Sequence, residues 1–222
     1  MDCENKIETY VHLQEETAQS VLSYSSCLLS PLAGMVSESK KSLDDVRADV
    51  EQHIRSIMDF PKEGINFRDI MPLFAHPNIV NDLCKGIAQH IRADVGEIDA
   101  IAALEARGFL FGPIVAILLG VPFVPIRKQG KLPGECLQAS YVKEYGEDVI
   151  EIQKDAISAG WKVVIIDDLL ATGGTLKAAV DLIEKANATV SEAFMIIELA
   201  PLHGREKVPG TPVSALIVYN QA

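Results

Sequence analysis

Hydrophobic residues from Ser42 onward follow two kinds of spacing, which together predict alternating helices and strands. The first helix carries apolar residues three or four positions apart: Leu43, Val46, Val50, Ile54 and Ile57. Ser42 with Asp45 resembles a capping box at the beginning of this helix, and Pro61 marks its end. A second helix begins after Pro77 and shows the same spacing: Ile79, Val80, Leu83, Ile87 and Ile91.

Short apolar runs predict strands at 100–104, 121–126, 163–166, 193–199 and 213–218. Apolar helices are expected between them, one ending near Leu119 and one running from Thr175 to about Lys185. Because strands and helices alternate, the sequence predicts an α/β domain with a mostly parallel sheet flanked by helices. The stretch 129–150 is a long excursion between two strands, and such segments tend to be lids or binding loops.

Residues 1–41 lack these patterns. Thr17–Ser37 has no charge, but its six serines make it too polar for a transmembrane helix. Acidic residues precede it, which argues against a secretory or organellar signal. We therefore expect a weakly ordered extension at 1–41, one domain at 42–222 and no membrane association. A chain that starts at Met35 should retain full activity.

The overall composition narrows the class further. The 222 residues are 48% hydrophobic and 23% charged, which suits one α/β domain with a substantial core. A net charge of −11 argues against a nucleic-acid-binding surface. The four cysteines form no C-x-x-C pair and the histidines show no metal-ligand spacing, so we expect a reducing, cytoplasmic location and no metal ligands from the protein.

The most informative chemistry lies directly after the predicted strand at 163–166. Asp167 and Asp168 end this strand, and a loop of small residues then opens a helix: Ala171, Thr172, Gly173, Gly174 and Thr175. Backbone amides in such a loop can approach a phosphate, and the helix N-terminus favours an anion. The carboxylates would repel that phosphate unless they face sugar hydroxyls or a metal ion. The segment therefore predicts a site for a phosphorylated ribose.

A cluster of cations follows the strand at 121–126 and consists of Arg127, Lys128 and Lys131. In an open α/β sheet, ligands gather outside the carboxyl ends of the strands. The cluster is therefore a candidate anion site, although most runs of charge are solvated loops.

These features resemble the type I phosphoribosyltransferases, whose fold is Rossmann-like with a flexible hood loop. The resemblance covers about residues 43–220, and four blocks are similar to the members that use adenine. They are Phe60–Ile70, Glu105–Phe109, Arg127–Gly134, and Ala139–Tyr141 with Glu144–Gly146. It implies a glycosyltransferase of purine salvage that converts adenine and phosphoribosyl pyrophosphate to AMP and pyrophosphate. It also implies a homodimer and Mg²⁺ carried by the substrate pyrophosphate.

The resemblance assigns roles to the phosphoribosyl side. Asp167 and Asp168 would hold the ribose hydroxyls, and Ala171–Thr175 would cradle the 5′-phosphate. Arg107 and the cations Arg127, Lys128 and Lys131, here called the basic loop, would contact the pyrophosphate. The excursion at 129–150 would be the hood, with Glu144 handling the proton at adenine N9 and Tyr145 contacting the reacting phosphates.

On the base side, Phe67 would stack on adenine, Leu199 would close the opposite face, and the Asn66 backbone would read the base edge. Arg68 either supports the base or pyrophosphate region or pairs with Asp69. Two departures are Ala106, where many members carry a hydroxyl residue, and Asn66, where some relatives are apolar.

Two alternatives remain. One is a phosphoribosyltransferase for another base, against which the block Phe60–Asp69 argues. The other is a non-catalytic nucleotide sensor on the same fold, against which Arg107, Lys131 and Glu144 argue because a sensor could lose them.

Overall fold

The predicted strands assemble into one seven-stranded sheet with the order β5-β6-β4-β3-β7-β8-β9. The computed structural model describes residues 42–142 and 147–221, without the side chains of Val142 and Glu147. The strands are β3 (Ala100–Leu104), β4 (Phe123–Lys128), β5 (Cys136–Val142), β6 (Glu147–Gln153), β7 (Lys162–Leu170), β8 (Thr189–Leu199) and β9 (Val213–Tyr219). Strands β4, β3, β7, β8 and β9 run parallel, which confirms the predicted α/β class.

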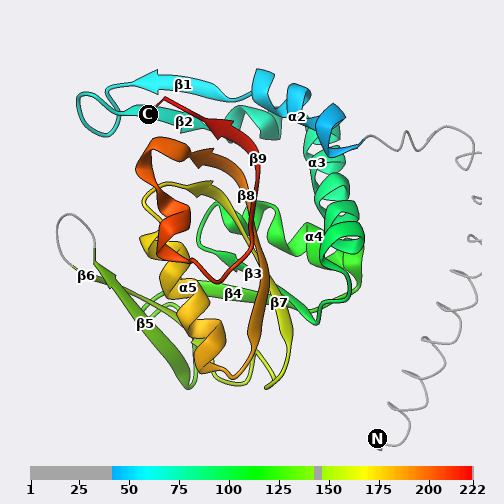
Figure 1. Ribbon diagram of the computed structural model, residues 1–222, viewed down its shortest axis with the longest axis vertical. Coiled ribbons are helices and arrows are strands. Elements are labelled where there is room, and N and C mark those ends of the chain that lie inside the picture. The colour runs from blue at the N-terminus through cyan, green and yellow to red at the C-terminus, as the bar shows by residue number, and fades with distance from the viewer. Residues whose placement is uncertain (1–41, 143–146, 222) are drawn as a thin grey trace, which may run out of the picture. The chain divides into compact units, whose positions relative to one another are not determined.

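Helices cover both faces of this sheet (Figure 1). Helices α2 (Leu43–Gln52), α3 (Pro77–His90) and α4 (Gly112–Leu119) pack in one core, and α5 (Gly174–Lys185) packs in the other. Alternate residues of β3 serve the two cores, because successive strand side chains point to opposite faces: Ala102 lies in the core with α5, and Ile101 in the core with α3. The carboxyl ends of the parallel strands thus form one edge between two packed layers.

Short helical turns complete the described residues. They are η2 (Met71–Ala75), η3 (Ile91–Val95), η4 (Gly108–Leu110), η5 (Ala200–Leu202) and η6 (Gly204–Lys207). Among the described residues, no helix combines the length and the apolar character that a membrane span requires. The predicted extension at 1–41 lies outside the described residues.

The first predicted helix is wrong in its second half. Helix α2 ends at Gln52, and Ile57 belongs to β1 (Arg55–Met58), which pairs antiparallel with β2 (Asn66–Asp69). The spacing of Ile54 and Ile57 continues the helical period by coincidence. The spacing of apolar residues does not show that β1 pairs with β2 some ten residues later, so the small β1–β2 sheet could not be inferred from it.

Three further boundaries differ from the predictions. Strand β4 continues to Lys128, so Arg127 and Lys128 lie within the strand and not in the loop that follows it. The excursion at 129–150 is largely regular, since β5 and β6 form an antiparallel hairpin that extends the sheet beyond β4. Strand β7 also does not end at the acidic pair, because its pairing with β8 continues to Leu170 opposite Glu198. Asp167 and Asp168 therefore lie within the strand, on opposite faces of its end.

Candidate active site

One carboxylate of the acidic pair near the end of β7, that of Asp168, is paired with an arginine from the loop after β3. Asp168 is 4% exposed, and its Oδ2 lies 2.7 Å from Arg107 Nε. Asp167 Oδ1 accepts the Asp168 backbone N–H at 2.9 Å. Burial and the adjacent Asp168 charge raise the pKa of Asp167 well above its ordinary value. Burial also raises the pKa of Asp168, and the Arg107 charge opposes that rise.

The loop between β7 and α5 rests on a second backbone segment. Gly173 has a φ of +78°, and a Cβ there would lie 2.2 Å from the Gly204 carbonyl oxygen. A Cβ on Gly204 would in turn lie 2.4 Å from the Ala171 carbonyl oxygen. The two glycines thus allow a close approach that any side chain would prevent. No side chain caps the beginning of α5, so its first amides are available to an anion.

Residues 105–108 follow β3 and lie directly against the end of β7. A Cβ on Gly108 would be 2.7 Å from the Ile166 carbonyl oxygen, so glycine is needed for this contact. The loop begins with Glu105, whose Oε2 accepts from Arg127 Nε at 2.6 Å. Arg127, a predicted anion-binding residue, is therefore paired with the Glu105 carboxylate, which lines the cavity described below.

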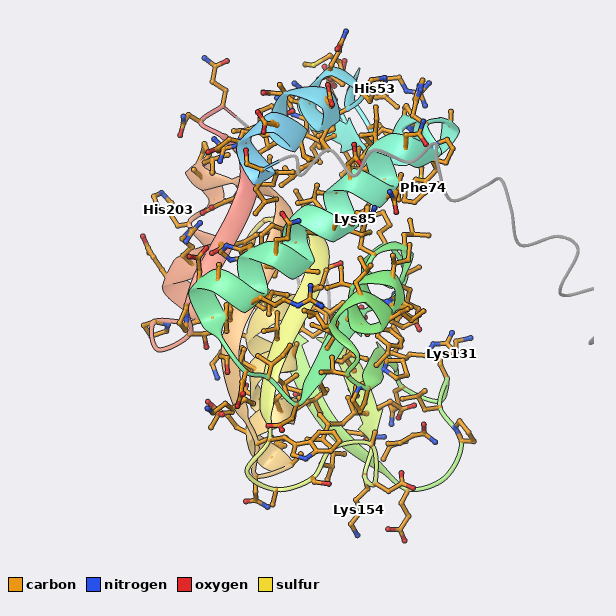
Figure 2. All side chains as sticks on the ribbon, turned by 90° about the vertical axis from the view of Figure 1, so that its right-hand side faces the viewer. His53, Phe74, Lys85, Lys131, Lys154 and His203 are labelled. Carbon is orange, nitrogen blue, oxygen red and sulfur yellow. The ribbon has the colours of Figure 1, made fainter. Side chains whose placement is uncertain are left out.

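The other two predicted cations lie further out. Lys128 Nζ is 3.7 Å from Asp148 Oδ2, and its side chain is 57% exposed. Lys131 projects into solvent from the loop after β4 (Figure 2). Neither lysine lines the cavity described below.

These loops enclose a cavity of about 450 Å³ at the carboxyl ends of β3 and β7. The cavity brings together the predicted Arg107, Asp167, Asp168 and Ala171–Thr175. It also includes residues to which the sequence analysis assigned no role in the site: Glu105, Ala106, Tyr141, Leu169, Leu170, Leu176 and Met195. Tyr141 and Met195 come from β5 and β8, and no local motif connects them with the acidic pair. Gly204 was missed for the same reason.

The predicted base-side residues do not line this cavity, although Phe67 lies close to its Arg107. The Phe67 ring centroid is 5.6 Å from Arg107 Cζ, and Phe60 packs on it edge-to-face at 5.1 Å. Leu199 ends β8 and pairs with Tyr219 of β9. The predicted Glu144 and Tyr145 fall outside the described residues.

The open question about Arg68 has a clear answer. Its guanidinium stacks on Tyr219 at 4.0 Å from the ring centroid, and it donates to Ser56 Oγ. Asp69 instead pairs with Arg55, whose Nη2 lies 2.5 Å away. Arg68 therefore attaches β2 to the end of β9, and pairing with Asp69 was wrong. Asn66 Oδ1 and Arg68 Nε are buried atoms that have no hydrogen-bond partner within the described residues.

This fold with this cavity defines a phosphoribosyltransferase, and residues 72–214 match the family model of the phosphoribosyl transferase domain. Adenine phosphoribosyltransferase from Caenorhabditis elegans is 64% identical over 179 residues, covering 81% of this chain and 97% of the relative. The human enzyme of that name is 50% identical, covering 77% and 95%. The chain belongs to the adenine phosphoribosyltransferase family, and it is therefore an enzyme of the pentosyltransferase class.

Solved structures agree with this assignment. Adenine phosphoribosyltransferase from Saccharomyces cerevisiae, in complex with an imino-altritol bisphosphate and adenine, superimposes with a TM-score of 0.75 at 45% identity. That match covers 77% of this chain and 98% of the yeast chain. The enzyme from Thermoanaerobacter pseudethanolicus gives the same TM-score and identity, and covers 78% and 99%.

Proposed function

We propose that the cavity at the ends of β3 and β7 is where this chain joins adenine to a phosphoribosyl group. As a member of its family, the chain transfers 5-phosphoribosyl from phosphoribosyl pyrophosphate to adenine, giving AMP and pyrophosphate in purine salvage. One observation carries the location: Arg107, the acidic pair and the uncapped beginning of α5 line a single cavity. The similar yeast enzyme, crystallised with adenine and a bisphosphate, supports it.

The phosphoribosyl side divides between amides and carboxylates. Backbone N–H groups of Ala171–Thr175 bind the 5′-phosphate, helped by the dipole of α5. Asp167 and Asp168 accept hydrogen bonds from the ribose hydroxyls and lie where positive charge develops at C1′ as pyrophosphate leaves. Burial raises the pKa of both carboxyls. In the same low-dielectric surroundings, a hydrogen bond that a ribose hydroxyl donates to either carboxylate is stronger than it would be in water.

The leaving pyrophosphate requires cations. Arg107 provides one within the cavity, and Arg127, Lys128 and Lys131, which do not line the cavity, would approach the pyrophosphate from the end of β4 and the loop after it. The described residues include no group of three or more histidine, cysteine, aspartate or glutamate side chains arranged for a metal ion. Two carboxylates with a polyphosphate nevertheless suit Mg²⁺, which keeps waters and takes substrate oxygens. Mg²⁺ bound to the pyrophosphate, close to Asp167 and Asp168, would neutralise its developing charge.

The base side consists of Phe67 stacking on adenine, Leu199 on the opposite face and the Asn66 backbone at the base edge. Arg68 supports this side indirectly, through its contact with Tyr219. Glu144 handles the proton at adenine N9 and Tyr145 contacts the phosphates from the hood. Replacing Glu144 with alanine should lower kcat far more than adenine affinity, and an unchanged kcat would exclude the role.

We also propose a cytoplasmic homodimer. Helix α4 presents Ile117, which is 79% exposed, beside Ile114, which is 38% exposed. Apolar side chains in such positions are typical of surfaces that contact another chain. Light scattering should give the mass of two copies, and the mass of one copy would contradict the proposal.

Pyrophosphate release is the decisive measurement for the reaction. The full chain with phosphoribosyl pyrophosphate and adenine should release pyrophosphate and form AMP, and chelating Mg²⁺ should stop it. Hypoxanthine, guanine, orotate and uracil serve as controls, and a faster rate with any of them would change the assigned base. Binding of AMP without turnover would indicate the nucleotide sensor instead.

A further inference from the structure

A buried carboxylate outside the cavity holds the basic loop in place. Glu151 of β6 is 3% exposed. Its Oε1 accepts three successive backbone N–H groups, from Gly130 at 2.9 Å, Lys131 at 3.2 Å and Leu132 at 3.2 Å. Its Oε2 accepts from Gln138 Nε2 at 3.2 Å. Successive amides that converge on one point form an anion-binding nest, and here the anion belongs to the protein.

The loop held in this way connects directly to the cavity. Arg127 Nη1 donates to the Lys131 carbonyl oxygen at 3.0 Å, and Arg127 Nε donates to Glu105 Oε2 at 2.6 Å. Glu105 lines the cavity two residues before Arg107. A continuous series of hydrogen bonds therefore runs from Glu151 through the basic loop to the loop that carries Arg107.

The same carboxylate also joins the β5–β6 hairpin to this series. Gln138 lies on β5, and its backbone carbonyl accepts from Lys185 Nζ of α5 at 2.7 Å. Glu151 thus ties together three segments: the hairpin, the basic loop and, through Arg127, residues 105–107. The backbone amides of the nest already donate to Glu151, so the basic loop can bind a phosphate only through its side chains.

We propose that Glu151 is a positioning residue for pyrophosphate: it holds the backbone of Lys131, which in turn fixes Arg127 beside the loop of Arg107. The proposal rests on the proposed function, since it assumes that these cations meet pyrophosphate. Within the described residues, the hydrogen bonds of Glu151 go to the loop after β4 and to Gln138 and not to Phe67, Leu199 or Asn66, so handling of adenine should not depend on it. Only the charged carboxylate accepts on both oxygens, and hydrogen bonds to an ionised acceptor are the stronger kind.

The test compares Glu151→Gln and Glu151→Ala in the full chain. In the alanine variant, the KM for phosphoribosyl pyrophosphate and the Kd of magnesium pyrophosphate should rise about tenfold or more, because the cations lose their fixed positions. The glutamine variant retains one acceptor and should show a smaller rise of about threefold, since a neutral hydrogen bond is weaker. The KM for adenine should stay within about twofold in both variants.

Glu192→Gln is the matched control. Glu192 is also a buried carboxylate of the sheet, 4% exposed, but it bonds to His90 and Ser214 and not to the basic loop. This variant should lower the melting temperature while both KM values stay unchanged. That result separates positioning from a general loss of stability.

The outcomes are distinct. A parallel rise in both KM values, or unchanged pyrophosphate binding in both Glu151 variants, overturns the positioning role. If Glu151→Ala does not fold, the nearly isosteric glutamine variant decides. A wild-type chain that releases no pyrophosphate with adenine defeats the proposed function instead. Calorimetry with magnesium pyrophosphate remains a direct measure of Glu151 in that case.

Discussion

The phosphoribosyl side and the base side of the candidate site are built in different ways. The phosphoribosyl side belongs to the seven-stranded sheet, with Asp168 buried and the loop of Gly173 packed backbone to backbone on Gly204. The base side stands on the two-stranded β1–β2 sheet except for Leu199 of β8, and in β1 and the loop after it Met58 is 63% exposed and Phe60 is 51% exposed. Core packing fixes the first side, whereas side-chain contacts such as Arg68 on Tyr219 attach the second.

The phosphoribosyl side therefore depends on exact backbone positions, whereas the base side can tolerate small shifts. A phosphate cradle made of amides works only if the backbone is held to fractions of an ångström, and tight backbone contact achieves that. A flat apolar base requires mainly a ring and a surface. We therefore expect small changes to be severe on the phosphoribosyl side and moderate on the base side.

The largest effect should follow from Gly204→Ala. Its Cβ would lie 2.4 Å from the Ala171 carbonyl oxygen, so the phosphate loop must shift. A displacement of that size should lower kcat/KM for phosphoribosyl pyrophosphate about 100-fold. Gly210→Ala is the control, because a Cβ there meets nothing within 4 Å and neither glycine has a positive φ. Equal kinetics in the two variants would show that the contact does not shape the cradle.

A smaller effect is expected from Phe67→Leu. Losing the aromatic face should raise the KM for adenine about tenfold, the scale of one base stacked on a ring. The KM for phosphoribosyl pyrophosphate should change less than about twofold, because the phosphoribosyl side is packed separately. Phe60→Leu, which alters only the edge contact with Phe67, should have little effect on either value. A larger change for phosphoribosyl pyrophosphate than for adenine would contradict the division between the two sides.

The smallest effect concerns a region away from both sides. His90 Nε2 lies 2.9 Å from the buried Glu192, and its Nδ1 lies 2.8 Å from Asp94. Hydrogen bonding to Glu192, with a contribution from Asp94, raises the pKa of His90 above its ordinary value. The resulting stability is fully present below the unfolded pKa of about 6.5 and is lost as the pH rises through the folded pKa.

Raising the pH from about 6 to about 8.5 should therefore lower the melting temperature of the wild type about 2–4 °C more than that of His90→Gln. Differential scanning calorimetry measures this difference. The kinetics of the two proteins should agree at each pH, since His90 touches neither side of the cavity. A pH dependence of melting that is the same in both proteins would show that His90 contributes no linkage.

The two sides also differ in how far the sequence predicts them. Asp167–Thr175 is contiguous, and a buried strand followed by carboxylates and small residues is sufficient to place a phosphate and a diol. The parallel strands were predicted because their apolar runs are long and bounded. The β1–β2 sheet was missed because its pairing joins residues whose apolar spacing imitates a helix. No role was predicted for Tyr141, Gly204 or Glu151, because their contacts arise only when segments distant in sequence pack together.

The ion pair between Arg107 and Asp168 has a consequence for selectivity. A guanidinium already occupies one hydrogen-bonding direction of Asp168 at 2.7 Å, so a ribose hydroxyl must share this carboxylate with Arg107. A ribose with both of its hydroxyls offers this carboxylate a further hydrogen-bond donor. A sugar that lacks the hydroxyl would bury the remaining acceptor sites of Asp168 without a donor, and such unpaired buried acceptors discriminate more strongly than the loss of an exposed contact does. Deoxyribose analogues should therefore bind more weakly than the corresponding ribose compounds.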